Sequence, residues 1–449
     1  MKQITKHLSS THMILIGFLL IILAGSFLLW LPISSATGKS VSYIDALFTA
    51  TSATCVTGLV TLPTATTWST FGQVIILLLI QIGGLGVITI MAGIMVMLGK
   101  RIGMVNRILI QDSFNLNTMS GLVKFIKKVI IGSFVIEAIG ALLYMTVFVP
   151  DFGIKGIWIS VFNSVSAFCN AGIDIIAENS LCDYALNPVI NLTTSLLIIS
   201  GGIGFVVWWD LTRIIKDKKH RHLRFLTLHS KIALSVTFFL IVTGTVLFFV
   251  FEYNNPKTMQ SYSVLEKLEV SFFQSVTTRT AGFATIPQEN FTNSSALVSL
   301  LLMFIGGSPV GTAGGIKTVT VLILMLTAAS VIRNKNTVDV FNRQISAKSV
   351  KKAVAVFVTS FTVMAVSTIL LSIVSQGNFL DIIYETVSAT ATVGLTRNFT
   401  STLNMVGKII ITATMYFGRV GPISLAVAFG VKKGSKNIIE NPVEEISVG

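Results

Sequence analysis

Long apolar stretches separated by short polar segments make up most of this 449-residue chain. A transmembrane helix needs about 20 predominantly apolar residues, and eight stretches reach that length. Only 12% of the residues are charged, against about 25% in soluble domains. The pattern predicts an all-α polytopic membrane protein with eight spans in four pairs. The stretches lie at about 13–33, 71–98, 129–149, 189–209, 232–251, 296–332, 353–374 and 405–430.

A short segment with a repeated pattern lies between the two stretches of each pair. An aromatic residue precedes a glycine by ten positions in every copy, and the glycines follow one another after 114, 110 and 112 residues. Non-helical backbone at membrane depth is tolerated only where it lines a water-filled cavity or is buried in protein. We therefore expect four helix–pore-loop–helix repeats in a pseudo-fourfold arrangement around a central ion pore. The aromatic–glycine pairs are Phe48 and Gly58, Phe162 and Gly172, Phe272 and Gly282, and Tyr384 and Gly394.

The repeats divide the chain into four units and a tail. We expect repeat 1 in residues 1–115, repeat 2 in 116–225, repeat 3, with a broken second helix, in 226–345, and repeat 4 in 346–431. Residues 432–449 form a predicted C-terminal tail, which is too short for a regulatory domain.

The end of each pore segment is the predicted selectivity filter. Backbone carbonyls can replace the water shell of a cation, as in potassium-channel filters, and glycine permits backbone angles that point successive carbonyls the same way. Each copy has one glycine where a TVGYG filter has two, which predicts weaker discrimination between cations. The predicted filter residues are Thr54, Cys55, Val56, Thr57, Gly58, Cys169, Asn170, Ala171, Gly172, Arg279, Thr280, Ala281, Gly282, Ala391, Thr392, Val393 and Gly394.

Arg279 stands out because it lies inside the third filter segment. A guanidinium that lined a cation path would repel the ion. We therefore expect its side chain to point away from the path and to brace the loop, with Glu385 or Glu269 as its partner.

The second apolar stretch of repeat 3 holds five glycines and a proline between residues 306 and 315. This composition predicts a helix broken at mid-membrane, just inside the filter, where a flexible segment can block or open the path. In repeats 1 and 2, the glycines at 83–86 and 201–204 are explained by close helix packing. The predicted gate residues are Gly306, Gly307, Gly311, Gly314, Gly315, Lys317 and Arg419.

Arg419 is placed with the gate because it lies deep in the last apolar stretch, level with the glycine clusters of the other repeats. A charged side chain within the membrane is by default a candidate functional residue. It either holds the loop closed by hydrogen bonding its carbonyls or sets an electrostatic barrier. The structural alternatives are an ion pair and a side chain that snorkels to the interface.

The distribution of charge predicts the topology. The net charge is +14; with the N-terminus inside, 24 of the 33 basic residues fall in the five cytoplasmic segments and five fall in the outer ones. The positive-inside rule therefore places both termini in the cytoplasm. Acidic residues in the outer segments, among them Asp174 and Asp183, either concentrate cations near the mouth or are solvated loop charges.

The motifs of the chain resemble those of the Trk/Ktr/HKT superfamily of potassium transporters, and most closely those of a bacterial Ktr membrane subunit. The resemblance covers nearly the whole chain and rests on Cys55-VTGL, NAGI, RTAGF, TVGLT and GRVGP. It implies potassium uptake, often Na+-stimulated, through a homodimer in the bacterial cell membrane, with one pore in each chain. By position, the four repeat glycines match the family's filter, residues 306–315 its gating loop, and Arg419 its arginine.

The resemblance also implies a peripheral cytoplasmic ring of nucleotide-binding regulatory subunits, so that the nucleotide is bound by the partner and no cofactor is expected in this chain. The basic segments at 213–231 and 333–352 are candidate docking surfaces for that ring, although contact with inner-leaflet lipid explains them equally well.

Two other classes of protein compete with a gated potassium-conducting subunit. An ion-coupled secondary cation symporter with alternating access typically shows inverted or paired halves, whereas this chain shows four parallel copies. A membrane-embedded enzyme is not expected, because all five histidines lie in predicted cytoplasmic segments and the sequence has no HExxH motif.

Overall fold

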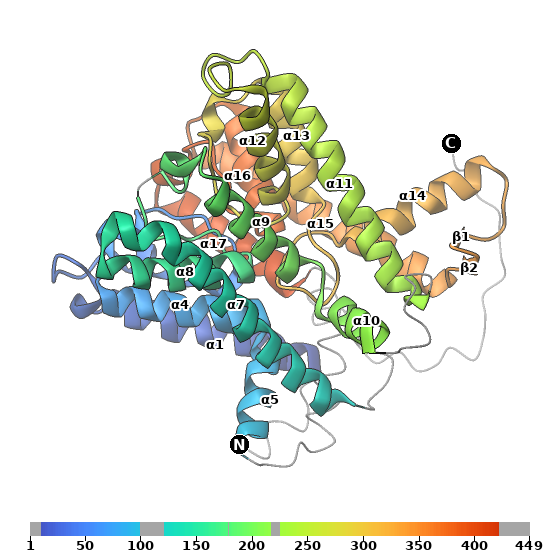
Figure 1. The fold of residues 1–449 in the computed structure, drawn as a ribbon, viewed down its shortest axis with the longest axis horizontal. Helices are drawn as coiled ribbons and strands as arrows, with labels where there is room; N and C mark the ends of the chain where they lie inside the picture. The colour runs from blue at the N-terminus through green and yellow to red at the C-terminus, as the bar shows by residue number, and fades with distance from the viewer. Residues whose placement is uncertain (1–9, 99–120, 178, 217–224, 422–449) are drawn as a thin grey trace.

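The computed structural model describes residues 10–98, 121–177, 179–216 and 225–421, and these residues are mostly helical (Figure 1). Four of the described helices are long and apolar enough to cross a membrane, and each begins one of the predicted repeats. They are α1 (Ser10–Trp30), α7 (Leu122–Phe152), α11 (Leu228–Glu252) and α15 (Ala347–Val374).

Each long helix is followed by a short helix that packs back against it. The short helices carry many Ser and Thr side chains, yet most of their residues are buried inside the protein, above all in the C-terminal half of each helix. The aromatic residue ten positions before the repeat glycine is fully buried in repeats 1, 2 and 4. These are the predicted pore helices: α2 (Tyr43–Cys55), α8 (Ile154–Cys169), α12 (Val264–Thr277) and α16 (Phe379–Ala391).

In repeats 1, 2 and 3 the second apolar stretch is not one straight helix. In repeat 1, α4 (Thr70–Leu85) and α5 (Val87–Met97) meet at 94°. In repeat 2, α9 (Pro188–Gly202) and α10 (Phe205–Lys216) also meet at 94°. Repeat 3 has α13 (Asn293–Phe304), an irregular loop over 305–317 and α14 (Thr318–Ile332).

These breaks correct the prediction of helix packing alone in repeats 1 and 2. Gly86 has φ +86° and Gly204 has φ +94°, and a residue with positive φ cannot continue a right-handed helix. In repeat 4, α17 (Met405–Val420) ends in the same way at Gly421, with φ +91°. A glycine therefore ends the straight part of the second helix in repeats 1, 2 and 4.

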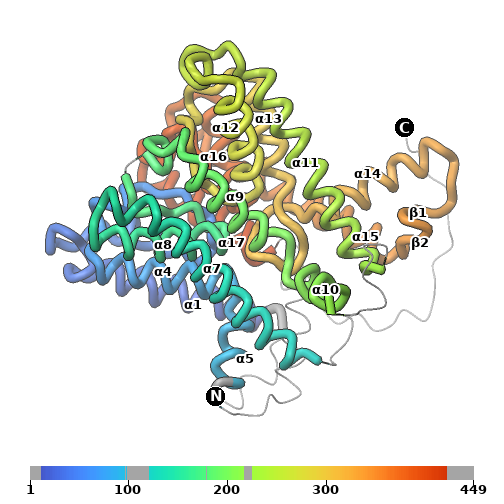
Figure 2. Tube along the Cα trace, in the orientation of Figure 1, coloured from blue at the N-terminus to red at the C-terminus, as the bar shows by residue number. Residues whose placement is uncertain are grey.

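The repeats, which Figure 2 colours in chain order from blue to red, close into a ring through contacts between neighbouring repeats. The second helix of each repeat packs against the pore helix of the next: α4 against α8, α9 against α12, α13 against α16, and α17 against α2. The last contact joins the end of the chain to its beginning. The four-repeat architecture is therefore as predicted.

Two further features lie outside this ring. A short hairpin of β1 (Asp339–Val340) and β2 (Arg343–Gln344) follows α14.

The long helices expose large apolar side chains, with Leu142, Phe238 and Ile373 each more than 60% exposed. Such surfaces suit contact with lipid rather than water, so the chain is a multi-pass membrane protein.

Several predictions fall outside the described residues. These are the end of the last apolar stretch at 422–430, the tail at 432–449, and the basic residues at 100–107 and 218–224.

Candidate functional site

The four repeat glycines meet at the centre of the ring. A Cβ atom built on Gly58 would lie 2.6 Å from the carbonyl oxygen of Ala171, the residue before Gly172. The same collision recurs around the ring. Each repeat glycine faces the carbonyl of the residue that directly precedes the repeat glycine of the next repeat. The other pairs are Gly172 with Ala281, Gly282 with Val393, and Gly394 with Thr57. The four segments are therefore close enough to touch only because these positions lack side chains.

The backbone has the same unusual shape in all four segments. The repeat glycines have φ values between +64° and +99°. The residue two positions earlier is also left-handed in every copy, although none of the four is glycine. A non-glycine residue held in this region costs about 1–3 kcal/mol and marks functional sites. These residues are Val56, Asn170, Thr280 and Thr392, with φ of 56°, 59°, 61° and 51°. All four belong to the predicted filter, but the sequence carries no signal for their left-handed backbone, because their side chains differ.

Serine hydroxyls hold three of the segments in place. The Ser52 Oγ accepts a hydrogen bond from the backbone N–H of Gly58 at 3.1 Å, and Ser388 does the same for Gly394 at 3.0 Å. Ser166 accepts from the N–H of Ile173. Each serine lies six positions before a repeat glycine, so the spacing was available in the sequence and was missed.

Repeat 3 has Val276 at the position of these serines. Thr277 takes over the role there, because its hydroxyl donates to the carbonyl of Phe283 at 2.6 Å.

Several hydroxyl groups at the centre of the ring have no hydrogen-bond partner among the described residues. The Oγ1 atoms of Thr54, Thr57, Thr390 and Thr392 are buried and form no hydrogen bond with the described residues. Buried polar groups normally form at least one hydrogen bond. Four buried hydroxyl oxygens beside the ring without such a partner among the described residues are therefore unusual.

A cavity of about 260 Å³, here called the vestibule, opens on one side of the ring. All four repeat glycines line it, which places the ring at its base. Asp174 and Glu289 are acidic residues of its lining, and no described lysine or arginine belongs to it.

The irregular loop 305–317 lies on the other side of the ring. The Thr312 hydroxyl contacts the carbonyl of Phe168 at 3.1 Å and the Oδ1 of Asn170 at 2.7 Å. The N–H of Gly314 donates to the Thr280 hydroxyl at 3.2 Å, and a Cβ on Gly314 would collide with Thr392. The loop is therefore held directly against the segments of repeats 2, 3 and 4.

Arg419 joins this loop to repeat 1. Its guanidinium donates to the carbonyl of Thr312 at 2.5 Å and to the carbonyls of Gly83 and Gly84. Arg419 thus hydrogen bonds one carbonyl of the loop, which is the contact that the first of its two predicted roles requires.

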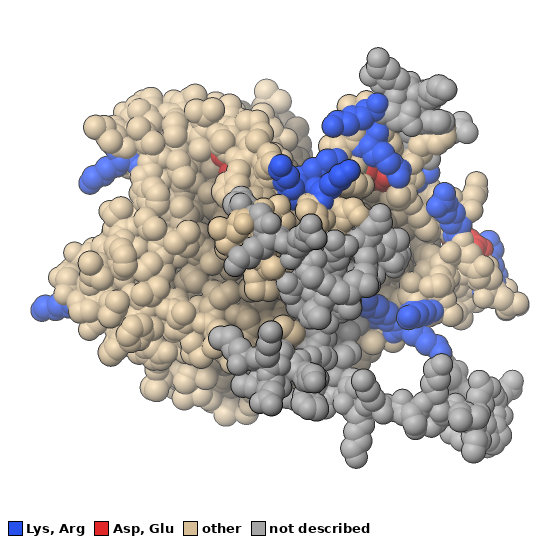
Figure 3. Space-filling view, turned by 90° about the horizontal axis from the view of Figure 1, so that it is seen from below, with Lys and Arg blue, Asp and Glu red and all other residues tan. Residues whose placement is uncertain are grey.

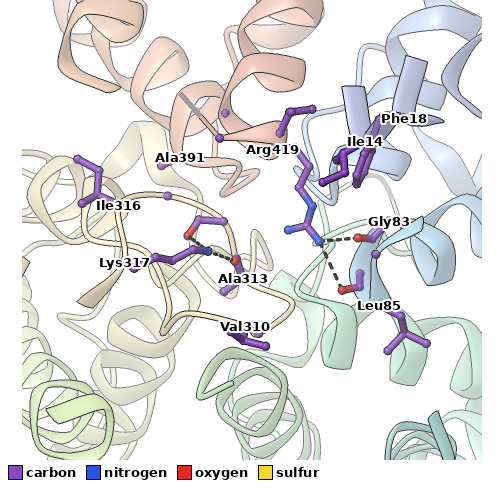
Figure 4. A pocket seen from close by; sticks show the side chains of 18 of the residues that line it. Ile14, Phe18, Gly83, Leu85, Val310, Ala313, Ile316, Lys317, Ala391 and Arg419 are labelled. Carbon is purple, nitrogen blue, oxygen red and sulfur yellow. Dashed lines mark hydrogen bonds between the residues drawn. The ribbon is translucent and has the colours of Figure 1, made fainter. Parts of the chain in front are cut away.

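Lys317 folds back on the same loop, because its Nζ donates to the carbonyls of Ala313 at 2.6 Å and Gly314 at 3.3 Å. A cavity of about 380 Å³, here called the loop cavity, lies between the loop and Arg419. Figure 4 shows Arg419 extending toward Gly83 on one side of this cavity and Lys317 beside Ala313 on the other.

The base of the loop is closed by the remaining glycines. The N–H of Gly306 donates to the carbonyl of Ile316, and Gly306 lies against Gly315. Gly307 accepts a hydrogen bond from the N–H of Thr318, and Gly311 lies against Gly204 of the neighbouring break. The structure thus brings all the predicted gate residues into one cluster.

Glycines of the second helices allow the pore helices to approach. A Cβ atom on Gly83, Gly201 or Gly418 would collide with the carbonyl four residues before a repeat glycine, which belongs to Thr54, Phe168 and Thr390 respectively. Close packing is thus the role of these glycines, whereas Gly86 and Gly204 break the helix.

The predicted partner of Arg279 was wrong. Its guanidinium is buried and donates to the hydroxyl of Thr237 on α11 at 3.1 Å. Glu385 instead accepts from Thr396 and Thr400, and Glu269 accepts from Asn191. The side chain does reach outward to the first helix of its repeat, as expected of a bracing residue.

Comparison with known proteins gives a consistent result. A family model described as "TrkH: Cation transport protein" matches residues 4–441. The chain is 40% identical to the Ktr system potassium uptake protein B of Bacillus subtilis, over 97% of this chain and 95% of that protein. It is 39% identical to the potassium/sodium uptake protein NtpJ of Enterococcus hirae, over 100% and 99%.

Among solved structures, the potassium transporter TrkH from Vibrio parahaemolyticus matches with a TM-score of 0.76 at 17% identity, covering 94% of this chain and 86% of that one. This likeness supports the fold, and the family match covers nearly the full length. The chain therefore belongs to the TrkH family of cation transport proteins and is a transporter rather than an enzyme.

Proposed function

We propose that this chain is the pore-forming subunit of a gated potassium uptake system of the Ktr type. The observation that carries the proposal is the closed ring in which each repeat glycine faces the carbonyl preceding the next. Four backbone segments that converge in this way can surround one cation. The potassium uptake named for the relatives supports K+ as that cation.

The ring suits a partly dehydrated cation. Carbonyl oxygens of the four segments provide the ligands for K+, as in other filters. The unpartnered hydroxyls beside the ring offer further oxygens to the ion or to its water. Because each segment has a single glycine, we expect K+ to be preferred over Na+ less strongly than in a filter with two glycines per segment.

Loop 305–317 is the proposed gate. It lies directly behind the ring, and Arg419 and Thr312 tie it to the surrounding repeats. Opening requires these hydrogen bonds to break, so the contacts of the loop favour the position seen here.

We further propose that the chain forms a homodimer in the bacterial cell membrane with both termini in the cytoplasm. A cytoplasmic ring of nucleotide-binding subunits controls the gate, and Na+ acts as a modulator. The Ktr system names of relatives support a multi-component system, and the name potassium/sodium uptake protein supports a role for Na+.

Flux measurements in liposomes test conduction against symport. KCl-loaded liposomes that contain the purified chain should take up trace Rb+ when an outward K+ gradient makes their interior electrically negative. No Na+ gradient is present in this assay. A conducting pore needs only the electrochemical gradient, whereas a symporter needs its coupling ion on one side.

Empty liposomes and the Gly282→Ser variant serve as controls in this assay. Rb+ uptake that appears only when an inward Na+ or H+ gradient is imposed would replace the proposed pore by a symporter. Uptake that is equal in liposomes with and without protein would remove the potassium assignment.

Uptake should also depend on external pH through Asp174. This carboxyl lies in the vestibule, between α8 and α9, and burial raises its pKa from 3.8 to about 6. Above pH 6 the carboxylate is charged and attracts K+; below pH 6 it is neutral. We expect Rb+ uptake to fall by about twofold to threefold as external pH drops from 7.5 to 5, a modest focusing effect of one charge.

The Asp174→Asn variant should show low uptake without the fall near pH 6. The initial rate of Rb+ uptake at constant membrane potential measures this. Glu289→Gln, which removes the second acidic group among the described residues of the vestibule lining, should lower uptake but keep the fall near pH 6. A fall near pH 6 that survives in Asp174→Asn would assign it to another group.

A further inference from the structure

A groove between α7 and α10 lies apart from the ion path. It encloses about 760 Å³, and its walls are apolar side chains of both helices, among them Val135 and Trp208. α10 makes an angle of 94° with α9, so it runs across the direction of the spanning helix before it. An amphipathic helix in this orientation, with tryptophans on it, is typical of the boundary between lipid and water.

Four lysines also line the groove, and none of the described residues in its lining is acidic. Three of them lie in the first two turns of α7, and the fourth ends α10. All four are exposed. They are Lys124, Lys127, Lys128 and Lys216.

Among the described residues of α10, the acidic Asp210 does not neutralise these lysines. Asp210 of α10 is buried and forms an ion pair with Arg213 at 2.6 Å. It also accepts the backbone N–H of Thr227 at 2.7 Å. Figure 3 shows several groups of Lys and Arg side chains, and few Asp or Glu side chains, on the face that it views.

Two details favour an anion with an apolar part. The Nζ of Lys128 lies 4.0 Å from the ring centroid of Trp209, so this ammonium group stands beside the aromatic wall. The N-terminal end of α7 is the positive end of its helix dipole. Three lysines there add like charge, and a bound anion offsets it.

We propose that this groove binds one anionic phospholipid, with its phosphate among the lysines of α7 and an acyl chain along Val135 and Trp208. The apolar walls require a partner with hydrocarbon, and the lysine rim requires one with negative charge. Basic side chains close to the membrane attract anionic headgroups, so one molecule satisfies both halves of the site.

Native mass spectrometry of the full chain tests the site directly. The protein is released from detergent in the presence of equal amounts of phosphatidylglycerol and phosphatidylcholine with identical acyl chains. We expect the wild type to retain one phosphatidylglycerol in preference to phosphatidylcholine. Lys127→Gln/Lys128→Gln should weaken this retention by roughly tenfold or more, as expected for the loss of two lysines near a headgroup.

Two further variants complete the test. Lys348→Gln/Lys351→Gln removes the same charge from exposed positions on α15 and should retain phosphatidylglycerol like the wild type. Val135→Trp fills the apolar wall without changing charge, and it should reduce the retention of phosphatidylglycerol although all four lysines remain.

Three outcomes would overturn the proposal. Equal retention of the two lipids by the wild type would show a crevice without headgroup recognition. Equal losses in the α7 and α15 variants would show diffuse surface charge instead of a site. Loss of a dimer in Val135→Trp with unchanged lipid retention would assign the groove to a second copy of the chain.

Discussion

Replacing Gly282 by serine is expected to reduce the preference for K+ over Na+ by about tenfold or more, equivalent to about 1.4 kcal/mol. Gly282 has φ +81°, which L side chains rarely adopt, and an added Cβ would lie 2.5 Å from the carbonyl oxygen of Val393. Because that carbonyl belongs to the neighbouring segment, the ring must widen or distort. Competition of K+ and Na+ with Rb+ uptake measures the change.

The control for this variant is Gly38→Ser. Gly38 also has a positive φ, +69°, but a Cβ there meets nothing within 4 Å. The Gly38→Ser variant therefore has the same kind of backbone strain as Gly282→Ser but no collision of its Cβ atom. Its preference for K+ over Na+ should equal that of the wild type. Unchanged preference in both Gly282→Ser and Gly58→Ser would contradict the filter assignment.

Deleting residues 310–314 is expected to raise Rb+ flux by about tenfold, which corresponds to about 1.4 kcal/mol off the barrier. The deletion removes Thr312, and with it the contacts to Arg419 and Phe168. It leaves the base of the loop intact, because Gly306 and Gly315 already lie against each other. The shortened chain can therefore close without pulling on α13 or α14.

Point variants at Thr312 separate gating from general damage. Thr312→Ala removes the hydroxyl contacts to Phe168 and Asn170 and should raise flux by a smaller factor. Thr312→Ser keeps a hydroxyl and should behave like the wild type. A loss of flux in correctly inserted deletion protein would show instead that the loop supports the structure of the path.

Much of the architecture follows from local pattern. The long apolar helices were predictable because each span meets the length requirement of the bilayer by itself. The pore segments were predictable because the aromatic–glycine spacing is repeated four times. The broken helix of repeat 3 was also predictable, since its glycines and proline cannot form a straight helix.

Local pattern did not predict the breaks in repeats 1 and 2. Gly86 and Gly204 lie in apolar stretches where glycine is common, and close packing was a sufficient explanation. Each glycine cluster in fact has two roles, close packing and breaking the helix. Gly83 and Gly201 pack against pore-helix carbonyls, while Gly86 and Gly204 take positive φ and break the helix. Residue type alone does not distinguish the two roles.

The sequence by itself determined the four membrane repeats, the positions of the repeat glycines and the presence of an interrupted helix. Only the tertiary structure decided which atoms meet at the centre. Arg279 bonds to Thr237 rather than to a carboxylate, and Arg419 joins Thr312 to Gly83. The last two pairings link residues more than 100 positions apart, and such contacts depend on how the repeats close into a ring rather than on any local pattern.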